Sequence, residues 1–237
     1  MRHAKISRLV FVTIKIHTML KSIIVETIRG KTLPRILMNE RIAEFSKTNP
    51  LKGEVIDLGS KSATMSYNRF FRKEDGCKIT YTDINPESKG VIRLNLEHEF
   101  NIKENFYDSA ICLNTLEHIY NYKNVIKESY KILKHGGLFI GFTPFLVQYH
   151  PDPEDHFRYT MTALNNMFEE SGFKKKIMEP IGIGYFSTGL YQVAMAVPKI
   201  IRPLIVLLLI FIDKIASVFM TKDANKYALG YFFVFQK

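Results

Sequence analysis

Two acidic residues at the ends of apolar segments have a spacing that suggests ligand chemistry. Asp57 lies in "EVIDL" just before Gly59, and Asp83 closes "KITYTD" in the next apolar segment. A strand that ends in such a loop offers backbone N–H groups and a helix N-terminus, which can bind the carboxylate or phosphate of a ligand. A carboxylate after the following strand can bind both hydroxyls of a ribose. The pair indicates a nucleotide-like ligand, although Asp83 in "TDINP" could equally be a turn residue.

The loop after Asp57 is poor in glycine. Lys61 and Ala63 stand where loops of this kind usually carry their second and third glycines. Gly59 still allows close approach of the backbone at the tightest point. The Lys61 ammonium could meet a carboxylate of the ligand but would repel a positive charge. We expect the loop to bind its ligand, with reduced affinity.

Two histidines are candidate proton acceptors, His118 after Glu117 and His150 at the start of "HPDPEDHFRYT". A histidine titrates near neutral pH and can take a proton from an oxygen or nitrogen acceptor. His118 could instead orient its loop.

The segment around His150 allows three interpretations. A metal site could use His150, Asp152 and Asp155, but no spacing demands one, so we expect no metal. An Asp155–Arg158 pair could simply pin the proline-rich loop. Alternatively, the segment covers the substrate, with His150 as base, with Arg158 holding an anionic acceptor and with Asp155 and Tyr159 on the acceptor side.

The elements that must position these residues alternate between strand and helix. Short apolar segments predict strands, which are 54–58, 78–82, 91–94, 107–113, 138–142, 173–180 and 228–235. Helical spacing predicts helices at 6–30, 34–47, 63–74 and 121–134, the last ended by a turn at 135–137. This alternation predicts an α/β fold, a Rossmann-like doubly wound sheet of about seven mostly parallel strands.

The stretches "NFYDSAICLNTLEHIYN" and "VIKESYKILKHGGLFIGFTP", with "VIDLGS" and "ITYTDIN" upstream, resemble class I S-adenosylmethionine-dependent methyltransferases. More narrowly they are similar to the branch with the LEH motif and the "H-x-x-P-x-D-x-x-R-x-T" type of segment. The resemblance covers residues 53–180 and the closing strand, and implies an antiparallel last strand. It also implies S-adenosylmethionine as the cofactor.

The resemblance assigns a part of the cofactor to each matching position. Asp57, Gly59 and Ser60 would border the methionine moiety, and Asp83 would take the ribose. The adenine would lie beside Ile84, Leu96 and Asn95, and the reacting methyl group would lie beside Asn114. The family more often has aspartate where Asn95 stands.

The net charge of +10 and the pI of about 9.4 suggest an anionic membrane surface or nucleic acid as partner. Nucleic acid is the less favoured, because no dense basic segment with interleaved aromatic residues is present. The two cysteines, Cys77 and Cys112, have no metal or disulfide spacing and suit a reducing cytosol.

An apolar segment at residues 203–212 is about half of the ~20 residues that a helix needs to span a bilayer. The surrounding residues 190–222 could form a buried cap, a homodimer contact or a monotopic anchor. Together with the basic amphipathic helix 6–30, they favour peripheral contact with the inner face of the membrane.

The sequence thus predicts four parts, 1–48 as N-terminal amphipathic helices, 49–189 as the core, 190–224 as a hydrophobic helical insert and 225–237 as the last strand. The predicted function is O-methylation of a small-molecule, glycan or lipid-linked acceptor. Members with such an insert are associated with cell-surface glycan pathways. The alternatives are a catalytically inactive protein with a decayed loop, acting as a membrane-associated scaffold or partner subunit, and, third, an RNA methyltransferase. Retention of Asp83 and of "LNTLEH" favours the enzyme.

Overall fold

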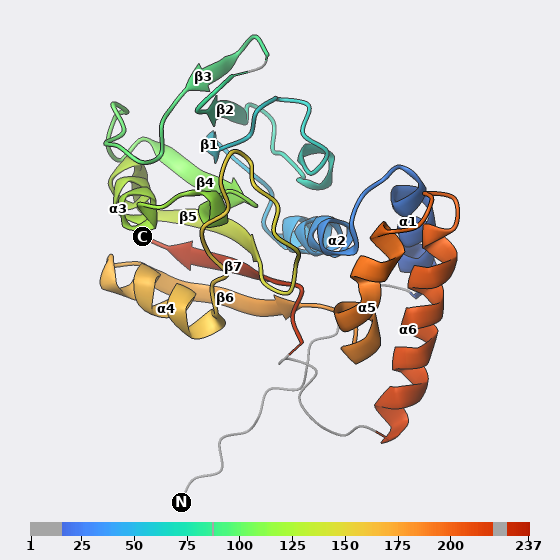
Figure 1. Cartoon of the computed structure of the whole chain (residues 1–237). Coiled ribbons are helices and arrows are strands. Elements are labelled where there is room, and N and C mark those ends of the chain that lie inside the picture. The colour runs from blue at the N-terminus through green and yellow to red at the C-terminus, as the bar shows by residue number, and fades with distance from the viewer. Residues whose placement is uncertain (1–15, 87, 220–226) are drawn as a thin grey trace, which may run out of the picture. The chain divides into compact units, whose positions relative to one another are not determined.

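The computed structural model describes residues 16–86, 88–219 and 227–237 (Figure 1). The chain forms two compact units. One unit consists of Met38–Pro180 and Gly230–Lys237, and the other consists of the described residues of Met1–Leu37 and Ile181–Leu229. Each unit is described by itself.

The larger unit is built on a seven-stranded sheet with the order β3-β2-β1-β4-β5-β7-β6. Figure 1 shows the strands following one another from β3 at one edge to β6 at the other. The strands are β1 Glu54–Leu58, β2 Lys78–Asp83, β3 Val91–Arg93, β4 Tyr107–Leu113, β5 Leu133–Pro144, β6 Lys174–Ile181 and β7 Gly230–Gln236. The predicted Rossmann-like fold is confirmed.

Strand directions place the chain's functional loops at one edge. β1 pairs in parallel with β2 and with β4, β2 with β3, and β4 with β5, so that these strands all end on the same side. β7 runs antiparallel to β5, which confirms the predicted reversal of the last strand. In open α/β sheets, ligands bind outside the carboxyl ends of the strands.

Apolar side chains fix the helices onto this sheet. α3 Tyr122–Ile132 buries Val125, Ile126 and Ile132, and α4 Met161–Glu170 buries Leu164 and Phe168. Phe168 stacks on Phe235 with ring centroids 4.3 Å apart. The Thr160 side chain caps α4 by accepting a hydrogen bond from the Ala163 N–H. α2 Leu33–Thr48 begins beside Pro34 and ends before Pro50, as the sequence predicts.

The helix predicted for residues 63–74 is wrong. Only a single 3₁₀ turn forms there, η1 Asn68–Phe70. Polar side chains bind the local backbone instead, because the Ser62 hydroxyl accepts from the Thr64 N–H at 3.1 Å and the Asn68 amide donates to the Ala63 carbonyl at 2.9 Å. Such bonds compete with helical hydrogen bonds.

The turn predicted at residues 135–137 is also wrong as a helix end. α3 already ends at Ile132, and Leu133 is extended at the start of β5. The pairing with β4 jumps from Leu133 to Leu138, so the intervening residues bulge out of the strand. Gly136 has a φ of 82°, which only glycine adopts at little cost.

The smaller unit is helical. α6 Arg202–Phe219 packs against α5 Tyr185–Met195 and against α1 Ile16–Ile28. The buried Asp213 of α6 accepts hydrogen bonds from the N–H groups of Phe186 and Ser187, both at 2.8 Å, and so caps the first turn of α5. Residues 6–15 of the predicted basic helix lie outside the described residues. Among the described residues, no helix is long and apolar enough to cross a membrane.

Candidate active site

The carboxyl ends of β1 and β2 bring together the two acidic residues singled out in the sequence. Asp57 pairs in register with Tyr81, and Leu58 with Thr82, so Asp57, the last residue but one of β1, and Asp83, the last of β2, lie at the same edge of the sheet. Ser60, two residues beyond β1, donates its N–H to the Thr82 carbonyl at 2.8 Å. The first loop is therefore held against the end of β2.

Asp57 is fully buried beneath the loop. Its Oδ2 accepts a hydrogen bond from the Tyr67 hydroxyl at 2.9 Å. Burial raises the pKa of the carboxyl to about 7, and the Tyr67 bond opposes that rise. Asp57 Oδ1 has no hydrogen-bond partner within the described residues. A buried carboxyl oxygen without a partner suits a cationic or N–H group of a ligand.

Gly59 makes the tight turn that the sequence predicts. Its φ is 75°, and a Cβ atom there would overlap the Cγ2 methyl of Thr115. The Thr115 hydroxyl in turn donates to the Leu58 carbonyl at 3.2 Å and so ties the ends of β1 and β4 together. Ser60 is wholly buried, and its Oγ has no hydrogen-bond partner in the described part of the chain.

Lys61 takes a left-handed conformation, with a φ of 39°, where related loops carry glycine. Its N–H donates to Asp83 Oδ2 at 3.2 Å, and its ammonium binds both oxygens of Asp152 at 2.7 and 2.8 Å. Asp152 belongs to the loop between β5 and α4. The positive charge of Lys61 is therefore paired with a carboxylate from a second loop.

Asp83 is held by the backbone on both of its carboxylate oxygens. Oδ1 accepts from the Asn85 N–H at 2.8 Å, and Oδ2 accepts from Lys61. Each oxygen has a second lone pair that can accept a hydroxyl hydrogen. Of the residues expected at the adenine, Ile84 is exposed and Leu96 is buried, while Asn95 Oδ1 accepts from the Glu97 N–H at 3.0 Å.

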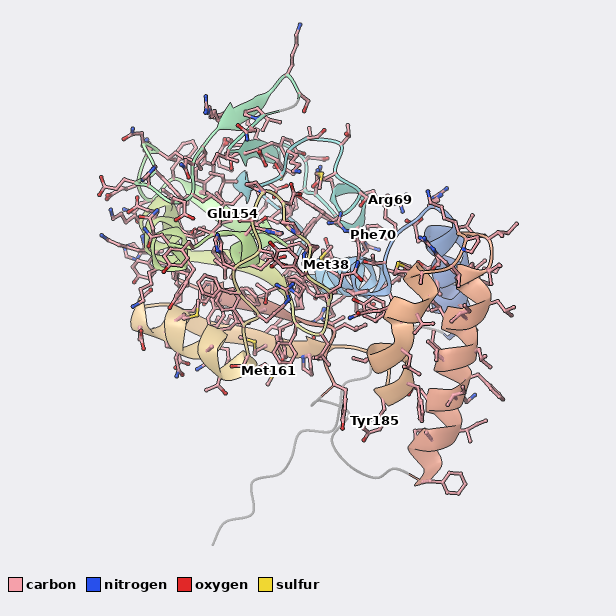
Figure 2. The ribbon with its side chains drawn as sticks, in the orientation of Figure 1. Met38, Arg69, Phe70, Glu154, Met161 and Tyr185 are labelled. Carbon is pink, nitrogen blue, oxygen red and sulfur yellow. The ribbon has the colours of Figure 1, made fainter. Side chains whose placement is uncertain are left out.

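Asn114 follows β4 directly and also has a positive φ, 51°. Its N–H donates to the Phe142 carbonyl at 2.9 Å, which fixes it to the end of β5. Its side-chain amide lies 3.3 Å from the sulfur of Met38 on α2, labelled in Figure 2. The backbone beyond β4 is thus held in an unusual conformation by its two neighbours.

Both candidate histidines lie next to the buried carboxylate of Glu117. Glu117 and His118 belong to η2 Leu116–His118, and His150 lies in the loop after β5. Glu117 Oε1 is 3.8 Å from His118 Nε2 and 4.0 Å from His150 Nε2. Burial lowers the pKa of His118, which favours its neutral form. We call these three residues the Glu–His–His cluster.

The loop that carries His150 is pinned by an ion pair, as one of the sequence interpretations proposed. Arg158 binds both oxygens of Asp155, with Nη2 2.6 Å from Oδ2, and also donates to the Gln148 carbonyl. This guanidinium holds the pKa of Asp155 well below its usual range. Tyr159 is buried, with its hydroxyl 3.3 Å from the Leu116 carbonyl. Asp155 therefore stabilises the loop that carries His150, and Tyr159 contacts the backbone of η2, which carries Glu117 and His118.

Sequence reasoning missed three residues of this site. Tyr67, Thr115 and Glu117 received no role, although the first binds Asp57 and the last lies between the two histidines. The available signal for Glu117 was its place directly before His118.

A hollow of about 520 Å³ lies at the opposite end of the strands. Lys52, Asp108 and Gly136 line it, near the starts of β1 and β4 and at the bulge of β5. It is the wrong end of an α/β sheet for a cofactor.

A family model described as a methyltransferase domain matches residues 31–176, more than half of the chain. The chain belongs to this methyltransferase family. The protein is therefore an S-adenosylmethionine-dependent methyltransferase, which confirms the expected class of activity and the expected cofactor. A comparison with curated protein sequences found no match.

Solved structures support the same fold. A SAM-dependent methyltransferase from Archaeoglobus fulgidus aligns with a TM-score of 0.55 at 15% identity, covering 86% of this chain and 94% of that one. The 1,6-didemethyltoxoflavin-N1-methyltransferase of Burkholderia thailandensis, solved with S-adenosylhomocysteine, gives 0.52 at 12% identity over 94% and 89%. The [4+2]-cyclase SpnF gives 0.54 at 13% identity over 84% and 80%. At such identities the likeness concerns the fold alone.

The residues of this methyltransferase fit its cofactor. Asp57 Oδ1 and Ser60 Oγ are buried polar atoms that have no partner among the described residues, and they lie at the loop that borders the cofactor in the family. Asp83 offers two backbone-oriented oxygens at the next strand end. Bound there, S-adenosylmethionine supplies an electrophilic methyl group on a sulfonium.

Proposed function

We propose that this methyltransferase transfers the methyl group to a hydroxyl oxygen of a small-molecule, glycan or lipid-linked acceptor. The observation that carries the proposal is the Glu–His–His cluster, in which Glu117 and His118 follow Asn114 in the chain after β4 and His150 joins them from the loop after β5. A hydroxyl becomes a good nucleophile only when its proton is removed or its charge is stabilised. Two imidazoles beside a carboxylate are suited to that task.

In this proposal the cofactor lies across the ends of β1 and β2. Asp57, Gly59 and Ser60 border the methionine moiety, and Asp83 binds the ribose. The adenine lies between Ile84 and Leu96. The Asn95 oxygen already accepts from the Glu97 N–H, and its second lone pair is left to accept from the adenine amino group. Asn114 borders the methyl group. The buried Asp57 Oδ1, which has no hydrogen-bond partner among the described residues, supports a cationic or N–H group of the ligand at this position.

On the acceptor side, His118 and His150 act on the hydroxyl, with Arg158 at the rim of the same loop. Arg158 already binds Asp155 on both oxygens, so it contributes an oriented loop more than a free positive charge. This arrangement favours a neutral acceptor group, such as a sugar or polyol hydroxyl, over a phosphate at this point.

We also propose that the protein contacts an anionic membrane surface through α6. Five large apolar side chains recur on this helix at intervals of three or four residues and are exposed, namely Leu204, Leu208, Phe211, Ile215 and Phe219. Lys199 and Lys214 are exposed beside them. An apolar stripe flanked by lysines is typical of helices that lie in the membrane interface.

Transfer of labelled methyl groups tests the acceptor class. The protein is incubated with [methyl-³H]S-adenosylmethionine and, separately, with polar lipid and glycolipid extract, with soluble nucleotide sugars, and with total RNA. We expect alkali-stable label in a hydroxyl-bearing lipid or sugar fraction. Label in the RNA fraction would contradict the proposal and support the nucleic-acid alternative.

A further inference from the structure

Three potential metal ligands from two separate segments converge at the acceptor side of the site. The donor atoms of Glu117, His118 and His150 all lie within 4.8 Å of one another. The carboxylate is wholly buried, and the His118 side chain is 10% exposed. The His150 side chain is 38% exposed, so the cluster is closed on one side and open on the other.

The other ring nitrogen of each histidine faces an oxygen acceptor. His118 Nδ1 contacts the backbone carbonyl of Glu154, which Figure 2 labels in the loop between β5 and α4. His150 Nδ1 lies 2.9 Å from the Gln148 carbonyl, 3.4 Å from Asp155 Oδ2 and 3.3 Å from Arg158 Nη2, and the shortest of these contacts, to the carbonyl, places the proton on Nδ1. An Nδ1–H that donates to oxygen leaves the lone pair on Nε2. Oxygen partners of this kind orient metal-binding histidines in proteins.

The backbone holds the two segments together independently of any ligand. The Glu117 carbonyl accepts the N–H groups of His156 and Phe157 at 2.9 and 3.2 Å. The two imidazole rings meet edge to face with centroids 5.2 Å apart. The two backbone bonds remain when the side chains of the cluster are changed, so they hold the segments in place as a binding site requires.

We propose that the Glu–His–His cluster binds a divalent transition-metal ion of the zinc class. Two imidazole nitrogens and one carboxylate form the ligand set of many catalytic zinc sites, which keep a further position open. Two donors on such an ion at about 2.1 Å lie roughly 3.0–3.4 Å apart. The observed 3.8 and 4.0 Å from Glu117 Oε1 to the two Nε2 atoms need to shorten by about 0.4–1.0 Å, and the remaining donor pair, within 4.8 Å, by at most about 1.8 Å.

This site deepens the proposed function, and its catalytic role rests on that function. The open position would bind the acceptor hydroxyl and lower its pKa, so that the proton leaves to water. The resulting oxygen attacks the methyl carbon, the C–O bond forms, the C–S bond breaks, and the sulfonium becomes a neutral thioether. In this arrangement the histidines hold the ion and do not take the proton themselves.

Metal binding is tested on the full-length protein without any methyl donor. The protein is freed of metal with a chelator and titrated with Co²⁺, whose visible absorption reports coordination by nitrogen and oxygen. We expect one equivalent to bind, to be displaced by Zn²⁺ and to resist excess Mg²⁺. His118→Ala and His150→Ala should each weaken Co²⁺ binding at least tenfold.

His156→Ala is the matched control, because His156 lies in the same loop but pairs with Glu154 outside the cluster. Its Co²⁺ affinity should equal that of the wild type. His150 is exposed enough that its removal should leave the fold intact, so His150→Ala keeps the test valid if His118→Ala misfolds. Absence of a stoichiometric Co²⁺ spectrum, or an equal loss with His156→Ala, would overturn the proposal. A metal that binds as predicted in a protein that labels only RNA would refute the proposed acceptor and leave this site standing.

Discussion

Asp57 carries the most unusual electrostatics of the site. Its pKa in the folded protein is raised to about 7 by burial, far above the usual value of an aspartate. Between the two pKa values the folded state holds a proton that the unfolded state has lost. Folding stability is therefore complete below the unfolded pKa and decreases as the pH rises toward 7.

Urea unfolding at pH 5 and pH 8 tests this expectation. The wild type should lose about 2.5 kcal/mol of stability from this group between these conditions, because the unfolded carboxyl is already mostly ionised at pH 5. Asp57→Asn keeps the shape of the side chain and removes its titration, so its stability should depend less on pH by that amount. If the stability of both proteins depended on pH in the same way, burial would not raise the pKa of Asp57.

At Lys61 the backbone conformation determines how a substitution changes the stability of the protein. Its φ of 39° is unfavourable for any residue with a Cβ. Lys61→Gly and Lys61→Ala both remove the ion pair with Asp152, but only glycine relieves the backbone. We expect Lys61→Gly to be more stable than Lys61→Ala by roughly 1 kcal/mol in urea unfolding. The opposite order would mean that the left-handed conformation is not populated in solution.

At the scale of the elements, the centre of the sheet depends on a glycine. A Cβ at Gly141 of β5 would overlap the ring of Phe233 on β7. Gly141→Ala should therefore destabilise the protein by about 1–3 kcal/mol. Gly189→Ala on α5 is the matched control, because nothing lies within 4 Å of its added Cβ.

That control should be neutral or should stabilise the protein by about 0.5–1 kcal/mol, since alanine favours a helix. Thermal unfolding of both variants measures the difference. A Gly141→Ala protein as stable as the wild type would mean that β5 and β7 do not pack as closely as described.

The sequence predicts an element correctly when a run of buried apolar residues defines it, and fails when specific hydrogen bonds or pairing with a distant strand decide the structure. β1, β2 and β4 are buried apolar segments, and their bounds in the sequence agree with the structure to within a residue or so. The segment 63–74 failed because Ser62, Thr64 and Asn68 hydrogen-bond the local backbone, which a helical pattern does not reveal. The bulge in β5 depends on pairing with β4, which is a contact between distant residues.

The residues of the site likewise divide into those that the sequence could predict and those that it could not. Asp57, Gly59 and Asp83 were predictable because each lies at or just past the carboxyl end of a strand, and parallel strands end at one edge. The convergence of His118 and His150 was not, because the loop after β5 reaches η2 through bonds to the Glu117 carbonyl. No local pattern encodes that distant contact. The role of Asp152 as the partner of Lys61 depends on the same loop.

At the scale of the whole molecule, the exposed apolar stripe of α6 predicts membrane binding. Phe211→Glu should reduce sedimentation of the protein with anionic phosphatidylglycerol vesicles, because it places a charge in the stripe. Met161→Glu is the matched control, since Met161 is also exposed and apolar but lies in the first turn of α4. Its vesicle binding should be unchanged.

Two results would contradict the membrane proposal. The wild type could remain in solution with vesicles present, or light scattering could show a dimer that Phe211→Glu converts to a monomer. The second result would assign the stripe to a contact between two copies of the chain. Salt should weaken vesicle binding only in part, because apolar burial adds to the attraction between lysines and lipid.

The most direct measurement is calorimetric titration of the purified protein with S-adenosylmethionine and with S-adenosylhomocysteine. Asp83→Ala removes the carboxylate expected to hold the ribose, and Asp75→Ala removes an exposed aspartate outside the site as a control. We predict micromolar binding of both ligands that Asp83→Ala weakens at least tenfold and Asp75→Ala leaves unchanged. Absence of binding by the folded wild type would contradict the cofactor site described here, and equal binding by Asp83→Ala would place the ribose elsewhere.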